Sequence, residues 1–509
     1  ILNSFSIQFT GFSGTRELDT FLTWNRARDL DDFKEGLQYF DFGSQNWAYT
    51  DTEGNLAYFA SGEAPLREDL QAGAVQGNPP WLLRDGSGGN EWLPDPDPAP
   101  GQAVPYQVIP PDEMPQVVNP PSGFFVNANN DPAGTTLDND PLNQTRPGGG
   151  IYYLNPGYDG YRGGRITDRL RAELDGDGTV SFADMQDIQA DVNLLDAGTF
   201  VPAILAAFDR GADGGHALAS LAGDPRVAEA VERLRTWDGS ARTGIPEGYD
   251  AADVDGQLGQ PSAEEVAASV AATIYSVWRG QFIANTIDAT LEPLGVAEPG
   301  DDQALSSLRN LLETFDTTGG VGASGLDFFA AGGGGAAALE DRRDTVLLQS
   351  LVDALDALAG PDFADAFGGS TNQDDYRWGI LHRVTFEHPL GGDRNAPPAG
   401  GFATPSALEG ISTDGGFNTV DASGHNGRAD AADEFGFGGG PVRRFVGESR
   451  PWGINAVSSV PGGASGLVES PWYTNLLGPW LTNEAFPQDL RYRSAITGAT
   501  EITYLRPGA

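Results

Sequence analysis

Residues 46–60 read NWAYTDTEGNLAYFA, two runs rich in aromatic and other β-forming residues around a central turn sequence. The turn, TEGN at 52–55, contains a glycine that suits a tight connection between antiparallel strands. We therefore expect a β-hairpin here. Apolar residues recur at helical spacing over 17–28 and 31–38, so two amphipathic helices are expected just before the hairpin.

Composition restricts the possible partners and chemistry. The 509 residues carry 72 acidic and 30 basic side chains, so the formal net charge is −42. Such a chain repels phosphate backbones, which argues against nucleic acid as a partner. Lys34 is the only lysine, and cysteine is absent. These counts exclude a P-loop, a lysine Schiff base, disulfides and a cysteine nucleophile. No apolar run is long enough to suggest a membrane span.

Composition also divides the chain into three expected parts. Residues 1–165 form the first part of a sheet-containing core, with a proline- and glycine-rich surface excursion over 71–122. Helical patterns dominate 166–375, and strand patterns with glycine-rich turns return over 376–509. Because β-rich segments flank the helical one, the predicted class is α+β, with the two ends sharing one sheet system.

Three asparagines gather at the end of an apolar run. Residues 123–132 read GFFVNANNDP, so a buried strand is expected to deliver Asn127, Asn129 and Asn130 into a turn. An asparagine amide can donate N–H to a developing oxyanion without titrating. Asparagine also closes turns through hydrogen bonds to the nearby backbone. The residues alone leave both interpretations open, a catalytic donor and a turn residue.

An acidic segment, ELDGDGTVSFAD at 173–184, has the spacing of a calcium-binding loop between two helices. Oxygen ligands would come from alternate positions, with a glycine at the sixth. The segment departs from the usual pattern at its first and last positions, where Glu and Asp are exchanged. The expected ligands are Glu173, Asp175, Asp177, Thr179, Ser181 and Asp184. The alternative is a polar turn between helices in which Ser181 caps the second helix.

Other motifs indicate structure rather than catalysis. Ser262 and Glu265 have the spacing of a capping box, which predicts a helix start. His382 and His388 lie six residues apart on a predicted strand and could face the same side as a metal pair. No carboxylate spacing supports a metal there, so structural hydrogen bonding is expected. No G-x-S-x-G motif for a serine nucleophile occurs.

Four separated segments together resemble the penicillin acylase family of N-terminal-nucleophile amidohydrolases. This family includes penicillin G, cephalosporin, aculeacin and acyl-homoserine-lactone acylases. The segments run in family order and lie within residues 21–58, 119–166, 378–391 and 463–480. The resemblance implies a partial four-layer αββα sandwich with a large helical excursion. It also implies hydrolysis of an amide through an acyl-enzyme, with release of an acyl side chain.

The resemblance assigns roles to residues at matching positions. Asn129 matches the asparagine whose side chain completes the family's oxyanion hole, and Arg165 matches the arginine that orders that asparagine and the substrate. Trp24 matches an aromatic residue near the acyl pocket. Asp140, with Asp138, matches the calcium ligand that this region contributes. Calcium is therefore the expected cofactor, in a structural role.

Family members mature by cleavage of a precursor into α and β chains, and the β chain begins with the nucleophile, usually serine. The resemblance aligns Ile1 well inside the β chain. It therefore implies that the nucleophile is absent from these residues and that this chain alone is inactive. The implied partners are the α chain and the N-terminal β segment of the same precursor.

The resemblance leaves the substrate open among a β-lactam, an acyl-homoserine lactone and a lipopeptide. It implies a periplasmic or secreted location. A non-catalytic calcium-binding or interaction protein on the same scaffold is the alternative function.

Overall fold

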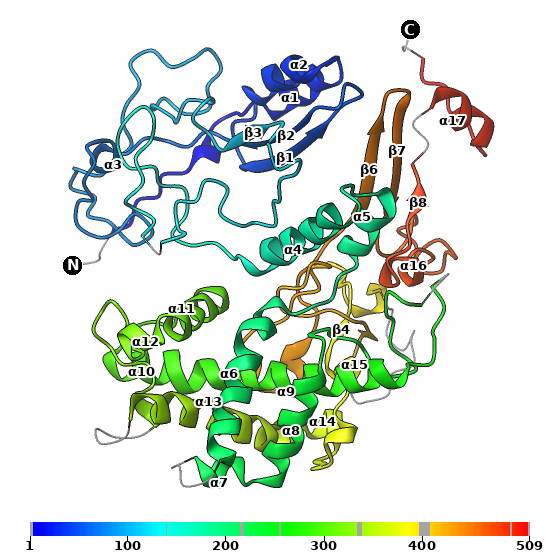
Figure 1. The fold of residues 1–509 in the computed structure, drawn as a ribbon. Helices are drawn as coiled ribbons and strands as arrows, with labels where there is room; N and C mark the ends of the chain where they lie inside the picture. The colour runs from blue at the N-terminus through cyan, green and yellow to red at the C-terminus, as the bar shows by residue number, and fades with distance from the viewer. Residues whose placement is uncertain are drawn as a thin grey trace. The chain divides into compact units, whose positions relative to one another are not determined.

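The computed structural model describes residues 4–138, 140–213, 218–253, 256–332, 338–396, 408–488 and 491–506. The chain forms two compact units (Figure 1). One contains residues 1–160 with 448–455, and the other contains 161–447 with 456–509. The three-part division by composition stays a prediction.

The first unit is built on a three-stranded antiparallel sheet in the order β1-β2-β3. Its regular elements are α1 (Glu17–Trp24), α2 (Leu30–Leu37), β1 (Gln45–Thr50), β2 (Leu56–Ser61), α3 (Glu68–Gln71) and β3 (Gln116–Val118). Trp47 pairs with Phe59 across β1 and β2, so the predicted hairpin is confirmed. The two predicted helices are also present.

Helix α1 ends at Trp24, four residues earlier than the sequence predicts. The reason lies in the start of α2. Asp29 caps α2 by accepting a hydrogen bond from the Asp32 N–H, with an extended backbone at φ −152°. An N-cap residue takes non-helical angles, so the chain must leave the first helix before it reaches Asp29.

Two expectations for the middle of the first unit need correction. The excursion over 71–122 does not lie only at the surface, because it buries Val104 and Ile109, each 6% exposed. Residues 124–127 form no strand, contrary to the prediction. Asn119 turns the chain with φ 48°, and the two prolines that follow it have no N–H for a sheet ladder.

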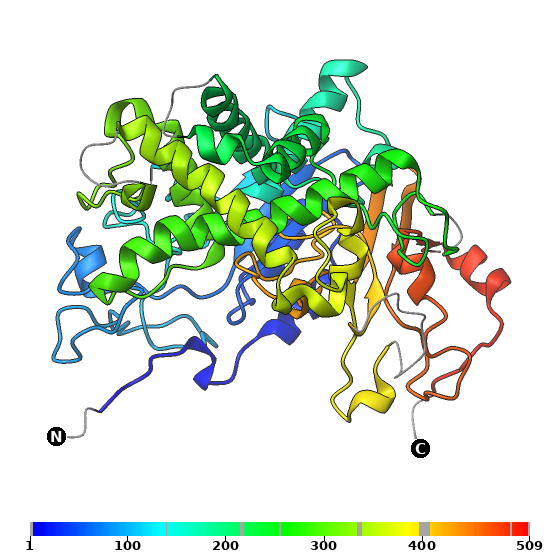
Figure 2. The same cartoon turned by 90° about the horizontal axis from the view of Figure 1, so that it is seen from below.

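The second unit is mainly helical and is built around α9 (Ala263–Ile283), which packs against α13 (Leu339–Leu358). Figure 2 shows this group of green and yellow-green helices from below. Helix α9 begins with the predicted capping box between Ser262 and Glu265. The other helices are α4 (Tyr161–Gly176), α5 (Phe182–Gln189), α6 (Leu195–Ala212), α7 (Ala219–Ala222), α8 (Pro225–Thr236), α10 (Ala289–Leu291), α11 (Asp301–Glu313), α12 (Phe315–Thr318), α14 (Ala364–Phe367), α15 (Trp378–Leu381), α16 (Leu477–Leu481) and α17 (Tyr492–Gly498).

Short strands follow the helical region. They are β4 (Arg383–Val384), β5 (Ile411–Ser412), β6 (Arg444–Arg450), β7 (Gly453–Ser459) and β8 (Phe486–Pro487). His382 does not lie on a strand as predicted, but between α15 and β4. It is fully buried, and its ring nitrogens contact the Thr413 and Ser423 carbonyl oxygens at 3.0 and 2.8 Å. The predicted structural role of His382 is therefore confirmed.

Within the described ranges, no helix is both long and apolar enough to cross a membrane.

Candidate active site

The segment that carries the three asparagines is attached to the sheet through Tyr58 on β2. The Tyr58 ring is 6% exposed and lies 5.6 Å from the Phe125 ring. Its hydroxyl donates a hydrogen bond of 2.6 Å to Asn46 Oδ1 on β1. The same hydroxyl is hydrogen-bonded by the Asn127 side chain. Asn127 is thus a structural anchor, which the sequence pattern did not separate from its two neighbours.

Asn129 occupies the turn that follows this anchor. It is exposed and has φ 61°, in the left-handed region where asparagine is tolerated better than most residues. The N–H of Ala128 donates to Asn130 Oδ1 at 2.8 Å. Asn130 therefore closes the turn, as the turn interpretation expects. The role of Asn129 as an oxyanion donor stays a prediction.

Asp131 fixes the far end of the same turn. Its carboxylate accepts hydrogen bonds from the N–H groups of Ala133, Gly134 and Thr136, at 3.0, 2.8 and 2.6 Å. Burial alone would raise the pKa of Asp131, but these hydrogen bonds outweigh it and the pKa is lowered. The backbone is therefore held on both sides of Asn129.

Trp24, predicted near the acyl pocket, lies in an aromatic cluster between α1, α2 and the sheet. Its ring stacks on Phe33 at 4.5 Å with 3° between the planes, and it meets Trp47 edge-on at 4.5 Å. Its Nε1–H donates to the Phe33 carbonyl at 2.8 Å. The side chain is half-buried. Contact of Trp24 with a substrate stays a prediction.

Arg165 on α4 is held by a carboxylate that sequence reasoning missed. Its Nε and Nη2 donate to Asp191 at 3.0 and 2.7 Å, and Arg169 Nη1 donates to the same carboxylate at 2.6 Å. Asp191 lies just after α5, and nothing in the local spacing links it to Arg165. Because Arg165 and Asn129 belong to different units, their predicted contact stays a prediction.

The acidic loop between α4 and α5 adopts the arrangement of a capped turn. Asp177 Oδ1 accepts from the N–H and the hydroxyl of Thr179, at 2.9 and 2.7 Å. Ser181 and Asp184 form a reciprocal capping box at the start of α5. Glu173 and Asp175 belong to helix α4, which runs to Gly176.

In this conformation the loop does not fit a calcium ion. A metal site needs several oxygen ligands around one point. In the part of the chain that the structure describes, no group of three or more acidic or histidine side chains could hold a metal ion. Calcium binding by the loop stays a prediction.

Asp138 and Asp140, the other predicted calcium ligands, lie exposed in consecutive turns of the first unit. Asp138 accepts from the Asn143 amide at 2.6 Å and from the Asp140 N–H at 3.1 Å. These hydrogen bonds lower the pKa of Asp138, that from Asn143 most. Asp140 in turn accepts from the Leu142 N–H at 3.0 Å. Calcium binding by Asp138 and Asp140 stays a prediction.

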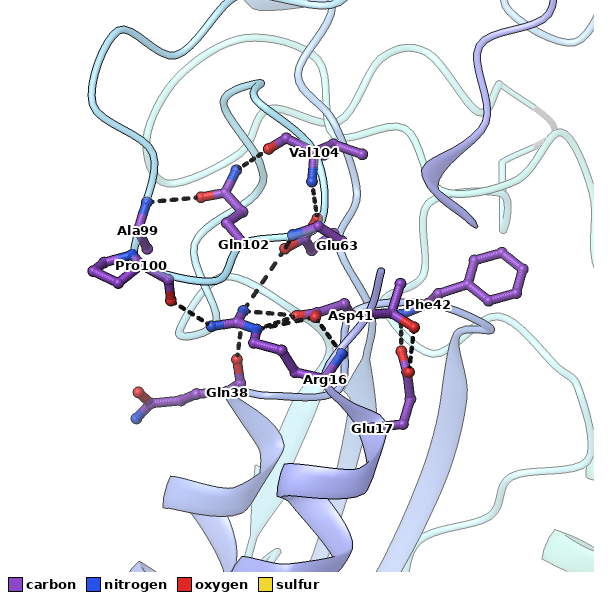
Figure 3. Close-up of polar contacts among 12 residues, drawn as sticks. Arg16, Glu17, Gln38, Asp41, Phe42, Glu63, Ala99, Pro100, Gln102 and Val104 are labelled. Atoms are coloured by element: carbon purple, nitrogen blue, oxygen red, sulfur yellow. Dashed lines mark hydrogen bonds and ion pairs between the residues drawn. The ribbon is translucent and has the colours of Figure 1, made fainter. Parts of the chain in front are cut away.

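A cavity of about 450 Å³ lies in the first unit, beside an ion cluster (Figure 3). Arg16 binds the buried Asp41 through Nε and Nη2, and its Nη1 donates to the Pro100 carbonyl at 3.1 Å. Glu63 lies 3.8 Å from Arg16 and accepts from the backbone of Ala103 at 3.0 Å. Burial raises the pKa of Glu63.

This cluster has a structural explanation. The Arg16 nitrogens are engaged by carboxylate and carbonyl oxygens of the chain itself, so the cluster ties the excursion to the end of α2 (Figure 3). Neither Asn129 nor Trp24 lines the cavity. No local sequence pattern could have predicted this cluster, because its members lie far apart in the sequence, at positions 16, 41, 63 and 100.

Comparisons with known proteins place these observations in a family context. A family model described as penicillin amidase matches residues 2–496. The chain is also similar to the solved structure of a thermostable penicillin G acylase from Alcaligenes faecalis in its orthorhombic form. The TM-score is 0.55 and the identity 16%, over 97% of this chain and 73% of that chain. At this identity the likeness concerns the fold, and it confirms the predicted α+β, N-terminal-nucleophile hydrolase class.

Proposed function

The chain belongs to the penicillin amidase family, and from this premise we propose that it forms most of the β chain of an enzyme that cleaves an acyl side chain from a small-molecule amide. Family membership supports amide hydrolysis in general. The proposed substrate classes are β-lactams, acyl-homoserine lactones and lipopeptides. The family match does not favour the alternative of a non-catalytic calcium-binding protein.

The observation that carries the proposal is the held turn at Asn129. Attack on an amide carbonyl places negative charge on its oxygen, and a pre-oriented N–H donor lowers the energy of that intermediate. Asn129 is exposed, uncharged and fixed between two anchored segments. In the proposed mechanism its amide, with one backbone N–H, binds the oxyanion while the acyl-enzyme forms and again while water releases the acid.

Further features of the proposal come from the family resemblance. The nucleophile is an N-terminal serine outside residues 1–509, with its own α-amine as base. Assembly with the α chain and the remaining β segment completes the site, and residues 1–509 alone are inactive. Arg165 orders Asn129 and the substrate, Trp24 contacts the acyl group, and the enzyme is periplasmic or secreted.

The test replaces Asn129 in the complete processed enzyme. Asn129→Gly removes the donor but tolerates φ 61° without strain, since glycine enters the left-handed region freely. Asn129→Asp keeps the shape and replaces the donor with an acceptor. With phenylacetyl and long-chain acyl amides, both variants should lose roughly 10²–10³ in kcat. Wild-type kcat in folded Asn129→Gly would leave Asn129 as a turn residue only.

A further inference from the structure

His382 joins the two ends of a loop in the second unit. The loop runs from Thr413 to Ser423 and begins directly after β5. Nδ1 of the His382 ring lies 3.0 Å from the Thr413 carbonyl oxygen, and Nε2 lies 2.8 Å from the Ser423 carbonyl oxygen. The side chain is fully buried, so bulk solvent reaches neither contact.

These two contacts determine the protonation state of the ring. A carbonyl oxygen only accepts hydrogen bonds, so each ring nitrogen has to donate an N–H. Neutral imidazole has one N–H, and only the imidazolium ion has two. In a neutral ring, one nitrogen lone pair would face a carbonyl oxygen at 3.0 Å or less. That arrangement leaves buried polar atoms without a hydrogen bond, which is costly.

Two aromatic rings stack on the imidazole and also favour a positive charge. The ring of Trp378 lies 5.2 Å from it with 11° between the planes, and the ring of Phe437 lies 5.8 Å from it with 12°. The face of an aromatic ring attracts a cation placed over it. Trp378 Nε1–H donates to the Gly415 carbonyl at 2.7 Å, so a second side chain from the same short stretch binds the loop.

The loop carries a carboxylate that compensates a charge on the ring. Asp421 is 3% exposed, and its Oδ1 accepts from the hydroxyls of Thr419 and Ser423 at 2.6 and 3.0 Å. An oxygen that accepts from two hydroxyls suits the ionised acid. Burial lowers the pKa of His382, whereas its two carbonyl partners and the charge on Asp421 raise it.

Three buried carboxylates and two arginines lie in this region. Asp421 lies 4.0 Å from Arg444, and Asp414 lies 3.8 Å from Arg242. Asp250 is the third buried carboxylate. Burial raises the pKa of Asp414, and the charges on Asp250 and Asp421 raise it further. A cationic imidazole supplies a third positive charge, which balances the three carboxylates.

The neighbouring histidine, His425, has a different protonation state. Its ring lies 5.7 Å from that of His382. Its Nε2 lies 3.0 Å from Arg279 Nη2, and a guanidinium can only donate. His425 is therefore neutral, with its proton on Nδ1. Burial and the charge on Arg279 both lower its pKa. The charge on Arg279 is itself paired with Asp196 at 3.2 Å.

We propose that His382 is an imidazolium clamp, protonated on both ring nitrogens at neutral pH, which holds the loop 413–423 closed and releases it as the pH rises. Loss of one proton removes the hydrogen bond at one end of the loop. The loop also supports Asp191, because the Asp421 N–H donates to the Asp191 carbonyl at 3.2 Å. The clamp thus makes the support of the Arg165 anchor sensitive to pH. It does not depend on the function proposed above.

The experiment labels the histidines of the complete processed enzyme with ¹⁵N and follows their ring nitrogens by NMR between about pH 5 and 10. The nitrogen chemical shift distinguishes a protonated ring nitrogen from an unprotonated one. Signals that are missing in His382→Gln belong to His382. We expect both of its nitrogens to carry protons at pH 7, and one of them to lose its proton only at higher pH.

A second variant tests the compensating charge and does not require replacement of the ring. Asp421→Asn should shift the loss of the His382 proton to lower pH, because the carboxylate that favours the cation is gone. Asp209→Asn, which removes an exposed carboxylate paired with Arg235, should leave it unchanged. His425 is the internal control in every spectrum, and it should show one protonated nitrogen throughout.

Hydrogen exchange tests the release of the loop. After correction for the intrinsic effect of pH, exchange of the amides in 413–423 should become faster relative to those of α9 once His382 loses its proton. A single protonated nitrogen on His382 at pH 7 would overturn the proposal, and the balancing proton would then lie on a carboxyl group such as Asp414. A doubly protonated ring whose deprotonation leaves exchange in the loop unchanged would overturn it as well, since the ring would then not hold the loop.

Discussion

Arg165 binds Asp191 with two of its nitrogens, at 3.0 and 2.7 Å, and both residues lie in the second unit. The Asp191 side chain is 4% exposed, and Arg169 binds it as well. Burial by itself would raise the pKa of Asp191, but the hydrogen bonds from Arg165, Asn193 and Arg169 lower it. The arginine predicted to orient the site is thus itself oriented by a buried carboxylate.

Asp191→Asn should destabilise the protein by about 2 kcal/mol at pH 7, the scale of a hydrogen bond to a charged group. An acid whose folded pKa is lowered stabilises the fold above the unfolded pKa, about 3.9, and this contribution is lost as the pH falls through the lower folded pKa. In urea unfolding, the difference from wild type should therefore be largest at pH 7 and should shrink as the pH is lowered below about 4.

The control for this prediction is an exposed ion pair. Asp209 binds Arg235 at 2.7 Å, with side chains 58% and 37% exposed. Asp209→Asn should change the free energy of unfolding by less than about 1 kcal/mol, as is usual for surface pairs. If Asp191→Asn costs no more than this control, Asp191 is not the anchor of Arg165.

A second carboxylate in the same unit should give the opposite pH dependence. Asp250 is buried and accepts from the Thr243 N–H at 3.0 Å. Burial raises its pKa to about 6, and the nearby Glu265 adds to the rise while Arg242 opposes it. Burial also raises the pKa of Asp414, and charge on Asp250 raises it further.

An acid with a raised folded pKa binds more protons in the folded state. Its contribution to the free energy of unfolding therefore weakens as the pH rises from about 4 towards 6, and it remains lost at higher pH. Asp250→Asn imitates the neutral acid, and Thr243 can rotate its hydroxyl to match. Between pH 4.5 and 7.5, the free energy of unfolding of wild type should fall by about 2 kcal/mol more than that of the variant. The free energy of unfolding is measured with urea at each pH. Parallel pH profiles for wild type and variant would contradict a raised pKa for Asp250.

One experiment can distinguish the two interpretations of the acidic loop over 173–184, a calcium site or a capped turn between helices. Ser181 caps α5, so Ser181→Ala should cost about 1 kcal/mol. The capping interpretation predicts the same cost with and without added calcium. A rise in melting temperature on adding calcium to wild type would support the calcium site instead. Asp177→Ala should then abolish that rise and Asp140→Ala should retain it.

Local signals in the sequence predicted much of the fold. The glycine turn between aromatic runs predicted the hairpin of β1 and β2, and the spacing of Ser262 and Glu265 predicted the start of α9. The apolar run at 124–127 was wrongly predicted as a strand. Its residues suit a strand, but after the turn at Asn119 they form no ladder with the sheet.

The candidate site could be predicted only where a family motif marks it. Asn129 and Arg165 lie in such motifs. Asp191 does not show its role in the sequence, because it binds Arg165, which lies 26 residues away. Contacts of this kind depend on the three-dimensional fold, and no periodicity or spacing encodes them.

The last prediction concerns the packing around Trp24. Gly36 is buried in α2, and a Cβ atom there would lie 2.5 Å from Trp24 Nε1 and 2.6 Å from its Cδ1. In α6, by contrast, Gly198 is exposed and a Cβ would meet no atom within 4 Å. An alanine normally stabilises a helix over glycine by about 0.5–1 kcal/mol. Gly198→Ala should show that gain in thermal or urea unfolding.

Gly36→Ala should do the reverse. The new methyl group must push the indole away, which breaks its hydrogen bond to the Phe33 carbonyl and its stacking on the Phe33 ring. Overpacking of this kind costs about 1–3 kcal/mol. If Trp24 also contacts the acyl group, KM for long acyl chains should change more than kcat. Equal stabilisation by the two alanine substitutions would show that the Trp24 indole can move aside at no cost. The packing of the aromatic cluster around Trp24 would then not be rigid.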